Sequence, residues 1–143
     1  MKKNKTRRQT LEDDLTNWTR FYVKARVDGQ CFYAGTDNVT CKGYPTWGHI
    51  VHQKDHKRLK WDLKNLECEC QGHNMSHFHS EGFFHAWWMK KDPARYDYLY
   101  SLKHASGKFD FGQLELMLID IKQRCEREGL LTDEKITKFW RDK

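Results

Sequence analysis

Apolar residues near the start of the chain recur at helical spacing. Intervals of three and four positions place them on one face of a helix, and they are Leu11, Leu15, Trp18 and Tyr22. The hydroxyl of Thr10 can cap this helix, and the acidic residues at 12–14 suit its first turn. The Asp28-Gly29 pair is typical of a helix end. The pattern therefore predicts an amphipathic helix from about Thr10 to this pair.

The helical pattern then stops. Glycine, asparagine, aspartate and threonine are frequent between residues 30 and 46, which predicts hairpins in this segment. A turn at TDN, residues 36–38, would bring Cys31 and Cys41 opposite each other as hairpin partners. The stretch WGHIVH at 47–52 is strand-like, and a basic loop follows it.

The second half of the chain favours helices. One helix is predicted to start near residues 72–74 and to run through FFHAWWMKK until Asp92-Pro93 breaks it. Another amphipathic helix is predicted over about 109–128, with Gly129 as its stop. Its apolar face consists of Leu114, Leu118, Ile121 and Cys125. The predicted fold class is α+β, rich in helices and poor in strands.

The composition indicates one compact domain. The chain has 143 residues, of which 38% are hydrophobic and 14% aromatic, which is enough to build a core and excludes a disordered protein. No run approaches the roughly 18 apolar residues that a membrane span needs. Residues 1–9 are basic and no apolar stretch follows them, so we expect a mobile basic arm rather than a secretory signal. We accordingly expect a soluble, cytoplasmic protein that makes no membrane contact.

Positive charge is concentrated in the first part of the chain. Residues 1–108 carry 19 basic and 12 acidic side chains, whereas residues 109–143 carry seven basic and eight acidic ones. The basic part coincides with the part that is rich in cysteine and histidine. Because lysine and arginine gain binding energy by releasing counterions from phosphates, a polyanionic partner is expected.

The cysteines and histidines predict a metal site. Five cysteines in a chain without a secretion signal argue against a disulfide framework. Structural zinc takes four nitrogen or sulfur ligands, usually as two closely spaced pairs, and Cys70 and His73 form one such pair. Cys31 would begin the other pair, completed by Cys41 across the predicted hairpin or by Cys68. The alternative is that these cysteines are small apolar residues of a core.

A group of histidines suggests hydrolytic chemistry. Seven of the eight histidines fall between residues 49 and 85. A neutral His49 could take a proton from water for attack on phosphorus, while one divalent ion neutralises the developing charge. Asn65 and Asn74 are the asparagines available to the site, and His77 lies one helical turn after Asn74. By itself, a histidine on an apolar strand is more often structural than catalytic.

Four blocks of the sequence resemble the NinG/Rap family of phage recombination nucleases. The opening LEDDLTNWTRFYVKARVDGQCFYAG resembles the family's first helix and the Gly-x-Cys turn after it. Lys60, Trp61 and His73 replace the family's Arg, Phe and second knuckle Cys. The other matching blocks are Gly-His at 48–49, LKWDLKN at 59–65 and CQGHN at 70–74. The blocks occur in the family's order and cover roughly residues 10–105.

This resemblance implies an HNH nuclease. The expected fold is a ββα-metal core with a treble-clef-like zinc finger and flanking helices. The nuclease domain would span residues 10–108, followed by a helical extension at 109–143. The implied zinc ligands are Cys31, Cys41, Cys70 and His73.

The resemblance also implies an active site that uses Mg²⁺ or Mn²⁺. Gly48 stands where many HNH enzymes carry a metal-binding aspartate, so His52 or Asp55 would contribute to the cation site. The implied roles are general base for His49, orienting or structural residue for Asn65, and cation ligands for Asn74 and His77.

The basic loop between the predicted base and Asn65 is expected to contact DNA. Trp87 and Trp88 could stack on bases, but we expect them to pack their helix onto the N-terminal helix. The residues of the loop expected to bind phosphates are Lys54, Lys57, Arg58 and Lys60.

The resulting expectation is a metal-dependent, structure-specific endonuclease. It would hydrolyse phosphodiester bonds in branched recombination intermediates such as Holliday junctions, D-loops or flaps. A homodimer is expected because resolving a junction needs two symmetric cuts. The alternatives are a non-catalytic zinc-finger module that binds DNA and an HNH nicking endonuclease with another phage function.

Overall fold

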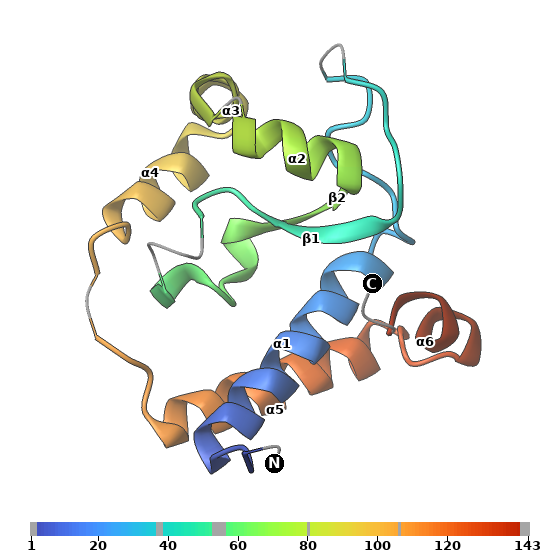
Figure 1. The fold of residues 1–143 in the computed structure, drawn as a ribbon, viewed down its shortest axis with the longest axis vertical. Helices are drawn as coiled ribbons and strands as arrows, with labels where there is room; N and C mark the ends of the chain where they lie inside the picture. Colours follow the sequence, from blue (N-terminus) through green and yellow to red (C-terminus); the bar gives the residue numbers. More distant parts are fainter. Residues whose placement is uncertain (1–2, 37–38, 53–56, 80, 106, 141–143) are drawn as a thin grey trace.

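The computed structural model describes residues 3–36, 39–52, 57–79, 81–105 and 107–140. Among these residues, six helices accompany one two-stranded sheet, and the predicted helix-rich α+β class is confirmed (Figure 1). No helix in these ranges is long and apolar enough to cross a bilayer. The elements are α1 (Arg7–Ala25), β1 (Pro45–His49), β2 (Leu66–Cys70), α2 (Gln71–His79), α3 (Glu81–Lys91), α4 (Pro93–Ser101), α5 (Phe111–Arg127) and α6 (Asp133–Phe139), with 3₁₀ turns at Lys57–Leu59 and Leu63–Asn65.

Helix α1 begins four residues earlier than predicted because a capping box forms upstream. The hydroxyl of Thr6 accepts a hydrogen bond from the Gln9 backbone N–H at 3.1 Å, and the Gln9 side chain accepts one from the Thr6 N–H at 2.9 Å. Residues 7–9 are therefore helical rather than part of an arm. Helix α1 ends at Ala25, before the predicted Asp28-Gly29 stop, and this pair lies in the turn that follows, with φ angles of 52° and 73°.

Helix α5 lies along α1, and the two share the first hydrophobic core (Figure 1). Gly129 ends the segment after α5 with a φ of 67°, as predicted. Helix α6, which the hydrophobic pattern did not predict, adds Phe139 to this core. The fully buried members from α1 and α5 are Leu15, Phe21, Ala25, Leu114 and Cys125.

Strands β1 and β2 form an antiparallel hairpin with Trp47 paired with Cys68 and His49 paired with Leu66. The first strand begins two residues before and ends three residues before the predicted 47–52, and the second was not predicted. Residues 30–36 and 39–44 contain turns and no strand, so the predicted hairpins there are wrong within these ranges. The loop is held by backbone bonds to the hairpin region instead, including the Phe32 N–H to the Cys68 carbonyl at 2.8 Å.

The predicted helix from 72 to 91 is two helices, α2 and α3, which run in different directions (Figure 1). This change of direction carries α3 away from α1, so the expected packing of Trp87 and Trp88 on the N-terminal helix is wrong. Instead Trp88 stacks on Phe32 at 5.4 Å and donates its indole N–H to the Tyr33 hydroxyl at 3.0 Å. The predicted break at Asp92-Pro93 is confirmed, since Asp92 caps α4.

Candidate functional site

Four side chains converge at the junction between β2 and α2. Nδ1 of His73 lies 3.5 Å from Sγ of Cys31, 3.7 Å from Sγ of Cys41 and 3.1 Å from Sγ of Cys70. All four donor atoms lie within 4.8 Å of one another. In a tetrahedral zinc site with ordinary bond lengths, sulfur and nitrogen ligands are about 3.5 Å apart. The cluster is thus a donor set that can hold a metal ion such as zinc.

The elements of the fold explain why these four residues meet. Cys70 ends β2 and His73 lies in the first turn of α2, so their side chains are brought together by the strand-to-helix turn. Cys31 and Cys41 come from the loop that precedes β1, which is tied to α2 by the Gly72 N–H donating to the Lys42 carbonyl at 3.1 Å. Cys68, the alternative ligand, instead packs with Val23 and Leu66.

The thiols of the cluster have unequal acidities. Burial alone would raise the pKa of Cys70, but hydrogen bonds from the backbone and ring of His73 lower it to about 7. Burial raises the pKa of Cys31 to about 12. A thiolate therefore forms at Cys70 before it forms at Cys31, and a bound cation would deprotonate the remaining thiols.

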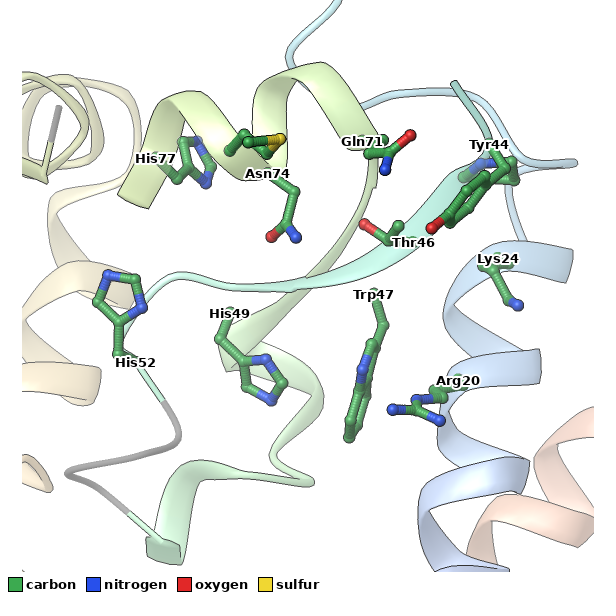
Figure 2. A pocket seen from close by; sticks show the side chains of 12 residues that line it. Arg20, Lys24, Tyr44, Thr46, Trp47, His49, His52, Gln71, Asn74 and His77 are labelled. Carbon is green, nitrogen blue, oxygen red and sulfur yellow. The ribbon is translucent and has the colours of Figure 1, made fainter. Parts of the chain in front are cut away.

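A groove of about 550 Å³ lies beside this cluster, between α2, β1 and α1 (Figure 2). Asn74 and His77 enter it from α2, while His49 comes from the end of β1 and His52 from the segment after it. The groove therefore brings together the predicted base and all three predicted cation ligands of the described chain. Asp55, the other candidate ligand, lies outside the described residues.

His49 is held as a neutral imidazole. Its Nε2 lies 2.9 Å from the backbone carbonyl oxygen of Lys60, which can only accept, so Nε2 carries the proton and Nδ1 carries the lone pair. Burial lowers the pKa of His49 to about 4, against the opposing effect of that hydrogen bond. An uncharged histidine with one nitrogen available for a proton is the form that a general base requires.

Asn65 lies outside the groove and holds the loop that follows β1. Its side-chain oxygen accepts from the Val51 N–H at 2.7 Å, and its amide donates to the carbonyls of Val51 and Leu59 at 2.9 and 3.1 Å. It is fully buried. These contacts favour the structural reading of Asn65 over direct contact with the His49 ring.

The sequence did not point to Glu69. This residue on β2 is fully buried, and its Oε2 lies 2.9 Å from Nδ1 of His77. Its carboxylate lies against Gly48, where a Cβ atom would be only 2.6 Å from Glu69 Cγ. The one available signal was a glycine on the neighbouring strand, which often marks a close approach of another group.

Two cations of α1 also line the groove and were not predicted. Arg20 and Lys24 are four positions apart and therefore lie on the same helix face. The guanidinium of Arg20 lies 5.1 Å from the centre of the Trp47 ring, which places it beside β1 (Figure 2). Their side chains place positive charge on the α1 side of the groove.

The basic loop lies elsewhere. Lys57, Arg58 and Lys60 line a second groove of about 640 Å³, together with Arg8 and Lys108. Arg58 packs on the Phe109 ring at 4.3 Å. Lys54 lies outside the described residues. The predicted phosphate-binding residues are therefore clustered, but on a surface separate from the His49 groove.

Comparisons with protein-family models, with curated proteins and with solved structures find no match to this chain.

Proposed function

We propose that the protein is a metal-dependent endonuclease of the HNH kind that resembles the NinG/Rap family and cuts branched DNA. The observation that carries the proposal is the state of His49. It is neutral, its Nε2 is bonded to the Lys60 carbonyl, and it lines the same groove as Asn74 and His77. A hairpin followed by a helix supports the ββα-metal arrangement, with His49 on the first strand.

In this proposal His49 accepts a proton from water through Nδ1 while the Lys60 carbonyl holds the ring. Asn74, His77 and His52 would hold Mg²⁺ or Mn²⁺, which supplies positive charge to the phosphate and to the leaving oxygen. Arg20 and Lys24, which line the groove, would bind the flanking phosphates. The chain's own contribution would therefore be to hold one base and several cationic groups along a single groove.

The zinc site has a structural role in the proposal. A cation held by the four cluster residues would fix the start of α2 to the loop before β1. That start sets where Asn74 and His77 enter the groove, because they are one and four residues after His73 on the same helix. Loss of the metal would then displace the cation ligands without changing them.

The preference for branched DNA rests on the family resemblance and on charge. The two grooves, one lined by Arg20 and Lys24 and the other by Lys57 and Arg58, offer two separate cationic surfaces. Each cationic surface could contact one duplex arm of a branched DNA. Contacts to the DNA backbone carry no sequence information, so such binding would recognise shape rather than sequence. A homodimer is part of this proposal because two symmetric cuts require two sites.

The second candidate is a DNA-binding module without catalysis. Gly48 favours it, since the residue beside His49 offers no carboxylate for a cation. In this case the zinc cluster and the basic grooves would be used for binding alone. The two functions differ in a direct assay.

The test is incubation of the purified protein with a labelled four-way junction, a flap and a matched linear duplex, each with Mg²⁺, Mn²⁺ or EDTA. The proposal predicts cutting of the branched substrates only with the divalent ions. Junction binding without cutting in any metal would support the module. Sequence-specific nicking of the linear duplex would identify an HNH endonuclease with another function.

A further inference from the structure

We infer that Glu69 supplies a carboxylate to the divalent-cation site of the groove, where it binds the ion together with His77. The inference rests on the proposed function for the use of that cation, but the site itself follows from three observations on β1, β2 and α2. The predicted cation ligands that lie on described residues are all uncharged or basic side chains. Glu69 would therefore add a negatively charged ligand to the site.

Burial is the first observation. The Glu69 side chain is 1% exposed, and neither carboxylate oxygen has a hydrogen-bond partner among the described residues. Nε2 of His77 is also buried and without such a partner. A buried carboxylate without partners is costly, and it is found mainly where it is paired or coordinates a metal. The cost indicates that a charged group belongs beside Glu69.

The second observation is the distance between the two side chains. Oε2 of Glu69 and Nδ1 of His77 lie 2.9 Å apart, yet their geometry does not make a hydrogen bond. Adjacent ligands in an octahedral magnesium site with bonds of roughly 2.1 Å are about 3 Å apart. The contact therefore has the length expected for two atoms that bind a common ion.

Gly48 provides the third observation. A Cβ atom at this position would overlap the Glu69 carboxylate and lie 2.6 Å from its Cγ. Any side chain at 48 would therefore displace the carboxylate from its place between β1 and α2. Glycine beside His49 thus makes room for an acidic group that arrives from the opposite strand. The absence of an acidic residue at 48 is explained by the presence of Glu69.

The competing explanation is a purely structural ion pair between Glu69 and protonated His77. Metal binding separates the two explanations, because an ion pair needs no divalent ion. The probe is Mn²⁺ alone, titrated into zinc-loaded protein without DNA and followed by electron paramagnetic resonance of the free ion. We expect Glu69→Gln, which keeps the size of the side chain, to weaken Mn²⁺ binding at least tenfold.

Two further variants sharpen the test. Glu67→Gln is the matched control on the same strand, because Glu67 is paired with Arg26 and Arg95 instead; it should bind Mn²⁺ as the wild type does. Gly48→Ala keeps every ligand but displaces the Glu69 carboxylate, and should also lose at least tenfold in affinity. This variant remains informative if Glu69→Gln fails to fold. Zinc content and circular dichroism should be unchanged in both.

The outcomes distinguish this inference from the proposed function. Wild-type Mn²⁺ affinity in Glu69→Gln or in a folded Gly48→Ala overturns the inference, even if the wild-type protein cuts junctions. Conversely, Mn²⁺ binding that depends on Glu69 in a protein that never cuts DNA would support the cation site and contradict the endonuclease. A wild-type protein that binds no Mn²⁺ would overturn the role of Glu69.

Discussion

The imidazole of His49 and the backbone carbonyl of Lys60 are joined by a contact of 2.9 Å that fixes which ring nitrogen carries the proton. Because the carbonyl can only accept, Nδ1 is left with the lone pair. The carbonyl belongs to the segment after the 3₁₀ turn at Lys57–Leu59, and Asn65 ties both ends of this loop together. The orientation of the proposed base therefore depends on a loop that a single buried asparagine holds.

The first prediction concerns the charge of His49. Its pKa is lowered to about 4, mainly by burial, so at neutral pH the ring is uncharged with its proton on Nε2. Because the unfolded chain has a histidine pKa of about 6.5, protonation favours unfolding. The contribution of His49 to stability is thus complete above pH 6.5 and is lost as the pH falls through 4. ¹H–¹⁵N spectra of the imidazole rings across pH 4–8 measure both the tautomer and the pKa. A His49 resonance that titrates near 6.5 would contradict this assignment.

The second prediction separates the ligand Cys70 from its neighbour Cys68. Cys70→Ala removes one of four donors and should abolish stoichiometric zinc in metal analysis of the purified protein. Cys68→Ala should retain one zinc per chain, because Cys68 packs with Val23 and Leu66 and only loses apolar contacts. Its expected cost in unfolding free energy is about 1 kcal/mol. Equal zinc contents in the two variants would exclude the proposed ligand set.

The third prediction distinguishes the two asparagines. Asn65→Ala leaves the Val51 N–H and two carbonyls without partners in a buried place, which should lower the free energy of unfolding by roughly 3 kcal/mol. Asn74 is exposed at the groove, so Asn74→Ala should change stability by no more than about 0.5 kcal/mol. Urea unfolding measures both effects. In cleavage assays we expect the reverse order. Asn74→Ala should lose more activity than Asn65→Ala, because it removes a proposed cation ligand.

The fourth prediction concerns the cations of α1. If Arg20 contacts a phosphate in the groove, Arg20→Ala should weaken binding to junction and duplex alike and reduce the salt dependence of log Kd by about 1. Arg127→Ala is the control, because Arg127 is exposed on α5, in the acidic part of the chain. Fluorescence anisotropy over a range of salt concentrations provides the slopes. An unchanged slope for Arg20→Ala would place the DNA elsewhere.

The sequence predicted the parts of the fold in which local pattern and packing agree. Leu114, Ile121 and Cys125 repeat with helical spacing, and all three are buried against α1. The spacing of Cys70 and His73 predicted that their side chains lie close together, since the two residues are three positions apart at the start of a helix. His49, Asn74 and His77, which the family resemblance named as site residues, line one groove.

The remaining features depend on contacts between segments that are distant in sequence. LECEC carries two glutamates, and nothing local shows that Glu69 is buried whereas Glu67 pairs with Arg26 and Arg95. The apolar face of FFHAWWMKK does not specify its partner, which proved to be Phe32 and Tyr33 rather than the N-terminal helix. Helix α6 did have a local signal, because Thr132 caps it and acidic residues begin its first turn.

The most direct test of the central claim is the single-turnover rate of junction cleavage by His49→Ala, with the bound fraction measured in the same samples. His104→Ala is the matched control, because His104 is an exposed histidine that does not line the groove. The account predicts that His49→Ala binds the junction as the wild type does but cuts it about 10²-fold or more slowly, while His104→Ala is unaffected. Cleavage by His49→Ala at the wild-type rate would contradict the assignment of His49 as the base.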